Sequence, residues 1–389
     1  MKDRDSPLQS LENGNWFKLI CGASYQHLPD IRNLALVYTL AGADCIDVAA
    51  DPATIAAAQE GINIALELRE KAPKELRDRY HNKPLLMVSL NDGEDPHFRK
   101  AQFNPEICPS DCWRPCEKVC PAIAIVFSDH NNFSGVIDQR CYGCGRCIPI
   151  CPSQIIYTRS YVSTPNTIAP LVQEAKIDAI EIHTQIGRES DFKRLWESIA
   201  PWRNQLKLLG ISCADGENLI DYLQTLYQII SPLNFTLVWQ TDGRPMSGDI
   251  GIGTTHPTIK LGEKVLAAKL PGYVQLAGGT NNHTVSKLRS LGLLHPQKTP
   301  TIKPLSPLSP KRDRTIAGVA YGSYARVLLS PILQELENLQ TQHPKLIAPD
   351  VTPQLQTITP NPHLTHLENL PDLLWQAVSL AHSLVSQIK

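Results

Sequence analysis

Residues 141–152 read Cys141-Tyr142-Gly143-Cys144-Gly145-Arg146-Cys147-Ile148-Pro149-Ile150-Cys151-Pro152. The spacing is C-x2-C-x2-C-x3-C-P, which is typical of the ligand segment of bacterial-type [4Fe–4S] ferredoxins. Gly143 and Gly145 allow the backbone to turn tightly without a Cβ clash. Pro152 then directs the chain out of the loop. The segment therefore predicts a [4Fe–4S] cluster, with four candidate iron ligands: Cys141, Cys144, Cys147 and Cys151.

A second cysteine run is expected nearby, because the fourth cysteine of such a segment usually ligates another cluster. The chain supplies four cysteines at intervals of four residues: Cys108, Cys112, Cys116 and Cys120. Only the last two, followed by Pro121, have the usual spacing, since a regular run would place cysteines at positions 110 and 113. Intervals of four suit one face of a helix, but Pro109 and Pro115 argue against a helix here. We therefore expect a widened loop that holds either a [3Fe–4S] or a distorted [4Fe–4S] cluster.

The exchange of fourth ligands also predicts which thiols share a cluster. We expect one group to combine Cys120 with the first three cysteines of the later run, giving Cys120, Cys141, Cys144 and Cys147. The other group then combines the remaining four: Cys108, Cys112, Cys116 and Cys151.

Zinc and disulfides are poorer interpretations of these cysteines. Structural zinc sites commonly use two C-x2-C pairs separated by a dozen or more residues, which the two compact runs do not provide. Residues 1–15 are polar and lack the apolar segment of a secretory signal, so disulfides are not expected. The other three cysteines, Cys21, Cys45 and Cys213, lie in apolar strand-like stretches, and we expect them to be core residues.

Composition narrows the class of protein. The 389 residues carry a formal net charge of −1, with a pI near 6.9, which gives no electrostatic argument for binding nucleic acid. No apolar stretch approaches the roughly 20 residues of a membrane-spanning helix. We expect a soluble protein of a reducing cytoplasm, where thiolates remain available to iron.

Strand and helix signals alternate on both sides of the cysteine runs. Eight strand-like stretches are 17–21, 45–49, 85–89, 179–183, 207–211, 235–239, 273–277 and 316–320. Amphipathic stretches between them include 29–41, 53–70, 189–200, 217–230 and 257–269. Eight strands separated by helices predict an α/β protein with a (β/α)8 TIM-like barrel, in which the strands at 85–89 and 179–183 are neighbours. A doubly wound open sheet would use the same alternation, and the count of eight favours the barrel.

The predicted barrel is interrupted once and extended once. Its first part covers residues 1–99, with strands one to three, and a two-cluster ferredoxin-like insertion covers 100–158. The second part covers 159–335, with strands four to eight and a proline-rich loop at 295–313. A C-terminal extension, 336–389, ends in a helix at about 366–387.

Ligands of such barrels bind at the carboxyl ends of the strands. Glycines follow the last two predicted strands, and with their neighbours they form a candidate phosphate or FMN site: Gly278, Gly279, Thr280, Gly322 and Ser323. Glycines at strand ends are also ordinary turn residues. Further polar candidates for the same face are Asp51, His183, Cys213, Asp242, Arg244, Asp249 and Asn281.

The chain resembles the light-dependent period A family of cyanobacteria. The resemblance rests on the two cysteine runs together with residues 18–25, Lys-Leu-Ile-Cys-Gly-Ala-Ser-Tyr, and 318–326, Gly-Val-Ala-Tyr-Gly-Ser-Tyr-Ala-Arg. It covers most of residues 15–335. It implies a redox-responsive input to the circadian clock that adjusts its period to light. It also implies one [4Fe–4S] and one [3Fe–4S] cluster, and the clock components KaiA, CikA and SasA as partners.

Two functions remain open at this stage. The first is a signalling protein whose clusters report redox state, and the second is an iron–sulfur flavoenzyme with a flavin in the barrel mouth. The sequence shows no convincing general base paired with a nucleophile, so we favour a sensor over an enzyme.

Overall fold

Eight parallel strands close into a barrel in the computed structural model. The model describes residues 7–71, 83–93, 98–127, 134–160, 176–244, 250–251, 253–295, 315–342 and 366–389. The barrel strands are β1 (Trp16–Gly22), β2 (Cys45–Ala49), β3 (Leu85–Asn91), β8 (Ala179–Thr184), β9 (Leu208–Ala214), β10 (Thr236–Asp242), β11 (Tyr273–Ala277) and β12 (Gly318–Tyr321). Their order is β1-β12-β11-β10-β9-β8-β3-β2, and β1 pairs with both β2 and β12. The predicted barrel is therefore confirmed, and the alternative of a doubly wound open sheet is excluded.

The register confirms the predicted neighbours on either side of the cysteine runs. Strand β3 pairs with β8 so that Met87 lies opposite Ala179 and Asn91 opposite His183. The chain thus leaves the barrel after β3 and returns to the adjacent position as β8, which keeps the barrel closed.

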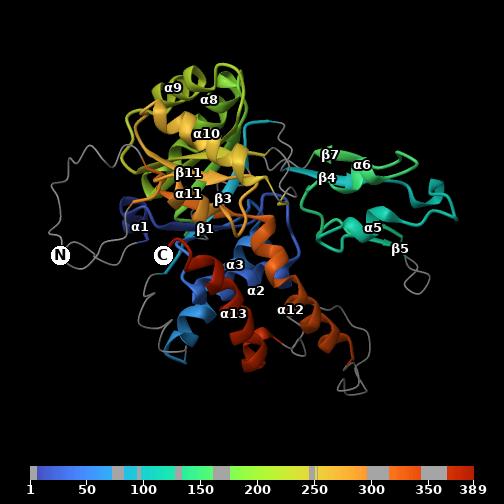
Figure 1. Ribbon diagram of the computed structural model, residues 1–389. Coiled ribbons are helices and arrows are strands. Elements are labelled where there is room, and N and C mark those ends of the chain that lie inside the picture. The colour runs from blue at the N-terminus through green and yellow to red at the C-terminus, as the bar shows by residue number, and fades with distance from the viewer. Residues whose placement is uncertain are drawn as a thin grey trace.

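Helices surround the barrel (Figure 1). They are α2 (Leu28–Ala41), α3 (Pro52–Leu68), α8 (Glu189–Ser198), α9 (Leu219–Ile230), α10 (Thr255–Ala267), α11 (Thr284–Ser290) and α12 (Ser323–Gln342). Local chemistry sets their ends: the Asp51 carboxylate accepts the N–H groups of Ala53 and Thr54 at 3.0 and 3.1 Å and so caps α3. The sequence patterns did not predict α1 (Leu8–Asn13), because its six residues are too few to show a helical period.

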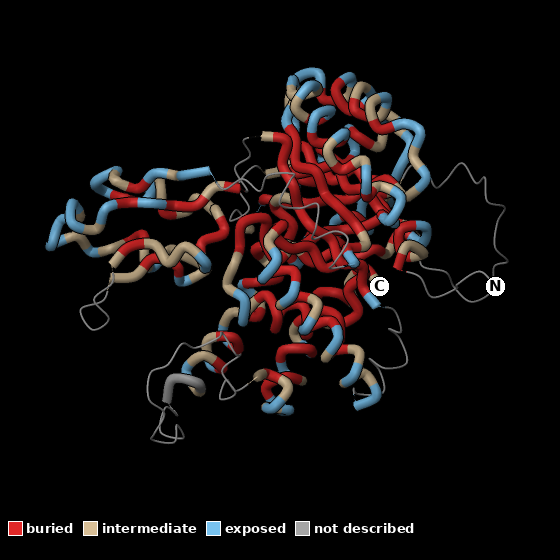
Figure 2. The backbone as a smooth tube through the Cα atoms, turned by 180° about the vertical axis from the view of Figure 1, so that it is seen from behind, coloured by how far each residue is buried: buried red, intermediate tan, exposed pale blue. Residues whose placement is uncertain are grey.

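The segment between β3 and β8 forms a small separate unit, which we call the cysteine module (residues 98–127 and 134–160). Strand β4 (Arg99–Gln102) pairs antiparallel with β7 (Tyr157–Ser160), and β5 (Ile125–Phe127) pairs with β6 (Ser134–Val136). Its helices are α5 (Pro115–Val119) and α6 (Cys147–Ile150). Figure 1 shows the module to one side of the barrel, and Figure 2 shows that most buried residues lie in the barrel.

The expectation that prolines keep the first cysteine run free of helix is wrong at α5. Pro115 occupies the first turn of this helix, where a missing N–H costs nothing because that group has no intrahelical acceptor. Cys116 therefore lies on a short helix, while Cys108 follows the 3₁₀ turn Pro105–Ile107.

The C-terminal helix α13 (Pro371–Val385) packs against α2 and α12. Figure 1 shows it beside these two helices. The predicted boundary between residues 335 and 336 falls inside α12, whose buried apolar side chains Ile332 and Leu336 continue one helix face across it. The predicted proline-rich loop at 295–313 lies outside the described residues apart from His295.

Among the helices that the structure describes, none combines the length and the apolar character required to span a membrane.

The barrel interior contains a buried ionic network centred on Lys18. Its Nζ lies 3.1 Å from Asp47 of β2, pairs with Glu181 of β8 and donates to the Gln240 amide oxygen at 3.0 Å. Gln240 donates to Glu181 at 2.7 Å. Burial alone would lower the pKa of Lys18, but the two carboxylates outweigh it and raise the pKa.

We predict that Lys18→Met destabilises the barrel by about 3–5 kcal/mol, because two buried carboxylates lose their cation. The matched control is Lys207→Met, since Lys207 is mostly exposed and pairs with Asp178 at the surface, where such a loss costs below about 1 kcal/mol. Urea unfolding followed by tryptophan fluorescence measures both. An equal decrease in the free energy of unfolding in the two variants would contradict a structural role for the network.

Candidate metal centre and barrel mouth

Four cysteine residues from two separate segments line one cavity of the cysteine module. They are Cys120 from the end of α5 and Cys141, Cys144 and Cys147 from the later run. Gly143 and Gly145 line the same cavity with φ of 70° and 73°, a left-handed backbone that glycine adopts without strain. The loop is therefore shaped so that three thiols from one segment and one from another face a common space.

The electrostatics of these thiols confirm that they are neighbours. Burial, together with the nearby thiols of Cys144, Cys141 and Cys120, raises the pKa of Cys147 to about 12. Burial likewise raises the pKa of Cys144 to about 11, with added contributions from Cys120 and Cys141. Thiolates so close together repel one another, and bound iron cations would relieve this repulsion.

The remaining four cysteines form a second neighbourhood, in which Cys116 and Cys151 are buried and Cys108 and Cys112 are half-buried. Burial raises the pKa of Cys108, and Cys112 and Cys151 raise it further. Burial also raises the pKa of Cys116, again with contributions from Cys151 and Cys108. Cys151 thus lies among the thiols of the earlier run, while Cys120 lies among those of the later run.

Backbone N–H groups point at two thiols of the enclosed group. Ala101 of β4 donates to Cys141 Sγ at 3.3 Å, and Ala124 donates to Cys120 Sγ at 3.2 Å. Hydrogen bonds of this kind stabilise thiolate charge and tune the reduction potential of an iron–sulfur cluster.

Four thiols that line one cavity suit a cluster of several irons. In the described part of the chain, no group of three or more His, Cys, Asp or Glu residues is arranged to hold one metal ion. A single zinc draws its sulfur ligands to about 2.3 Å from one point. Thiols distributed around a cavity instead fit a cubane, whose irons each take one thiolate at a separate corner.

The three other cysteines are buried core residues, as predicted from their apolar surroundings. Cys21 and Cys45 are fully buried and Cys213 is 5% exposed.

A second cavity lies at the barrel mouth. It is lined by all five residues predicted for a phosphate or flavin site, Gly278, Gly279, Thr280, Gly322 and Ser323, together with His183 and Asp242. Four of the further candidates do not line it: Asp51, Cys213, Arg244 and Asn281. Asp51 instead caps α3. Asp249 lies outside the described residues.

Among the residues of this cavity that the sequence patterns missed are Tyr142, Gln240 and Arg326. Arg326 belongs to the first turns of α12, and only its position after Gly322-Ser323 could have indicated it. Tyr142 lies beside a cysteine ligand candidate in the sequence, so its place at the barrel mouth depends on how the module docks.

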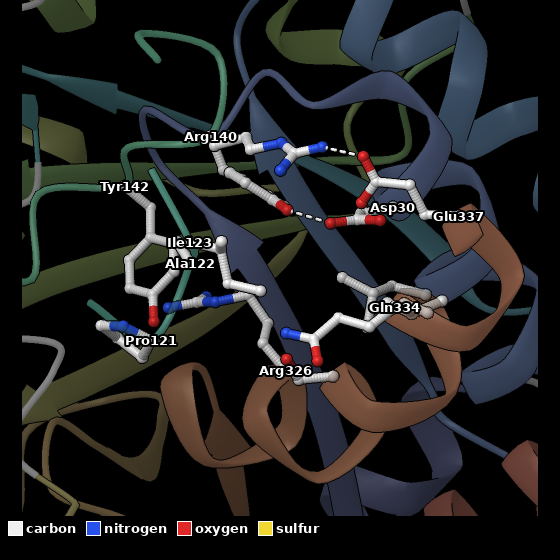
Figure 3. A pocket seen from close by; sticks show the side chains of 13 residues that line it. Asp30, Pro121, Ala122, Ile123, Arg140, Tyr142, Arg326, Gln334 and Glu337 are labelled. Carbon is white, nitrogen blue, oxygen red and sulfur yellow. Dashed lines mark hydrogen bonds and ion pairs between the residues drawn. The ribbon is translucent and has the colours of Figure 1, made fainter. Parts of the chain in front are cut away.

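The module contacts the barrel through a third cavity, shown in Figure 3. The guanidinium of Arg326 lies over the Tyr142 ring, 3.9 Å from its centroid, and Tyr25 meets the same ring edge-to-face. Arg140 of the module pairs with Glu337 of α12. Tyr142 lines three cavities: the one among the thiols, the one between module and barrel, and the one at the barrel mouth.

Comparisons with known proteins agree with this geometry. Residues 108–162 match the LdpA Fe-S cluster-binding domain, which makes the chain an iron–sulfur protein built on a (β/α)8 barrel. Residues 171–387 match the Light dependent period A C-terminal domain. A protein of Synechococcus elongatus named Light dependent period A is 46% identical over 357 residues, which span 91% of this chain and 93% of that protein. The chain belongs to the light dependent period A family.

We predict that Cys120→Ser and Cys144→Ser produce the same spectroscopic defect, because serine is a poor iron ligand and both thiols border one cavity. Cys151→Ser should instead reproduce the defect of Cys108→Ser. Iron and sulfide content and electron paramagnetic resonance of the oxidised and reduced protein measure the defects.

Cys213→Ser serves as the control, since this buried thiol lies on the barrel strand β9. If the spectroscopic defect of Cys120→Ser matched that of Cys108→Ser instead, each cysteine run would supply all the ligands of its own cluster. The predicted exchange of ligands between the two runs would then be wrong.

Proposed function

We propose that this protein carries two iron–sulfur clusters whose redox state it passes to the circadian clock, so that the clock period follows light. The observation that carries the proposal is the gathering of Cys120 with Cys141, Cys144 and Cys147 around one cavity. A cluster held there takes up or releases single electrons. The family name supplies the link to light-dependent period control.

We assign a [4Fe–4S] cluster to the enclosed group of four thiols. Its later run has the regular ferredoxin spacing, and its glycine conformations suit the turn. The second group, Cys108, Cys112, Cys116 and Cys151, holds a [3Fe–4S] or a [4Fe–4S] cluster. Its irregular spacing favours the three-iron form, which needs only three thiolates.

The barrel interior supports a sensor rather than an enzyme. Its buried acid and base groups already neutralise one another: Lys18 pairs with Asp47 and Glu181, and His183 Nε2 lies 3.0 Å from Glu181. Groups locked in such a network stabilise the fold and are poorly placed to exchange protons with a substrate.

As partners we propose clock proteins, among them KaiA, CikA and SasA, and as location the cytoplasm. The support for both is the family to which the chain belongs and the reduced thiols that cluster assembly requires.

A flavin-dependent oxidoreductase is the second candidate. The cavity at the barrel mouth favours it, because Tyr142 separates that cavity from the thiols and a flavin placed there would lie near the cluster. The absorbance spectrum of the purified protein decides between the two. Stoichiometric FMN beside the iron–sulfur absorbance favours the enzyme, and iron without flavin favours the sensor.

We predict that cells carrying Cys144→Ser lose the light-dependent adjustment of period while still producing folded protein. The substituted residue lies in the module and only packs against the edge of the barrel core, and serine is close to cysteine in size, so the barrel should remain intact. The measurement is the rhythm period at several light intensities, with Cys213→Ser as the control. A wild-type response in cells whose protein demonstrably lacks the cluster would refute the sensor function.

A further inference from the structure

The barrel mouth contains a buried arginine, Arg326, that pairs with no acidic side chain among the residues that the structure describes. Arg326 is 7% exposed; its Nη1 donates to the carbonyls of Ile20 and Cys21 at 2.8 and 3.0 Å, and Nη2 donates to Ser323 Oγ at 2.9 Å. Its Nε is buried and has no hydrogen-bond partner within the described part of the chain. Among the described residues, none of the ion pairs involves Arg326. Burial of a cation among neutral acceptors is costly unless an anion completes the site.

The surrounding backbone is also suited to an anion. Helix α12 begins at Ser323 and runs for 20 residues, so its N-terminus presents unpaired N–H groups and a partial positive charge at the cavity. Gly278 and Gly279, which follow β11, line the same cavity. This combination of glycine turns, helix N-terminus and arginine is the pattern by which proteins bind phosphate groups.

Gly322 leaves an open space at the barrel mouth, although the fold does not require a glycine at this position. A Cβ atom added there would meet nothing closer than 3.6 Å, and the residue is not among the glycines with positive φ. Neither backbone conformation nor packing therefore requires glycine at this position. The space that it leaves open belongs to the cavity beside Arg326.

We propose that the barrel mouth binds a small molecule bearing a phosphate group, which lies between Arg326, Gly322 and the N-terminus of α12. The same cavity is also lined by the polar side chains of His183, Gln240 and Asp242. Asp242 already accepts a hydrogen bond from Ser212, so its charge is partly satisfied within the barrel. The anionic end of the ligand therefore belongs at Arg326, and its hydrogen-bonding end belongs at these polar side chains.

The site is coupled to the iron–sulfur centre through Tyr142. The Tyr142 ring carries the Arg326 guanidinium on its face and also lines the cavity of Cys120, Cys141 and Cys144. A bound phosphate adds negative charge near the cluster, which disfavours an added electron and lowers the reduction potential. By linkage, reduction of the cluster weakens phosphate binding by the same factor. This coupling rests on the proposed iron–sulfur function, whereas the phosphate site does not.

The binding test uses inorganic phosphate as the probe and the complete, anaerobically purified protein with its iron content measured. Isothermal titration calorimetry should show saturable binding of one phosphate per chain, at least tenfold weaker in Arg326→Gln. Arg140→Gln is the matched control, because Arg140 lines the neighbouring contact with Glu337 and does not line the barrel mouth. It should bind phosphate as the unmodified protein does.

Arg326 also holds backbone carbonyls, so Arg326→Gln could lower stability. Gly322→Ala therefore provides a second variant: its methyl group fits the fold but occupies the space for the phosphate. It should weaken binding without lowering the melting temperature. Absence of saturable phosphate binding, an adventitious ion only, or equal binding in Gly322→Ala and the unmodified protein would each overturn the site.

The coupling is measured by redox titration with and without saturating phosphate. A tenfold difference in phosphate affinity between the two oxidation states corresponds to a decrease of about 59 mV for a one-electron couple. Arg326→Gln should abolish the decrease. An unchanged potential with phosphate bound would overturn the coupling alone. Phosphate binding retained by Cys144→Ser protein that lacks the four-iron cluster would show that the site does not depend on the proposed function.

Discussion

The barrel closes around one buried cation, Lys18, which is held by carboxylates from two other strands. Asp47 comes from β2 and Glu181 from β8, and the amides of Gln240 and Gln275 extend the network to β10 and β11. The desolvation of these charges is offset only when every partner is in place, so the network penalises any other strand order or register. Because the strands are fixed in this way, the ends of β11 and β12 meet beside β1 and create the cavity at the barrel mouth.

The cysteine module depends on a different constraint. Its small core contains Cys116, Cys141, Cys147 and Cys151 beside a few apolar side chains such as Phe103 and Ile125. A core of this size buries little apolar surface, and its thiols repel one another once they ionise. Iron is therefore expected to contribute to the folding of the module as well as to its chemistry, as metals do in other small domains.

The contact between Arg326 and Tyr142 joins the barrel to the cysteine module at a point where both units have functional residues. Arg326 projects from the barrel helix α12, and Tyr142 projects from the loop that carries Cys141 and Cys144. A change of charge on either side of the tyrosine ring alters the energy of a charge on the other side, because little water separates them. The same contact would carry redox information from the module to the barrel and to whatever binds at its surface.

Local sequence was sufficient for most of the architecture. Alternating strand and helix signals located all eight barrel strands to within a few residues, because buried parallel strands are continuous apolar runs. The cysteine spacings identified the candidate iron ligands, because a ferredoxin loop is a local structure. Tertiary structure alone decided two features: that α13 packs on α2 and α12, and that Tyr142 and Arg326 meet at the barrel mouth. These depend on contacts between residues far apart in the chain, and no local period or spacing encodes such contacts.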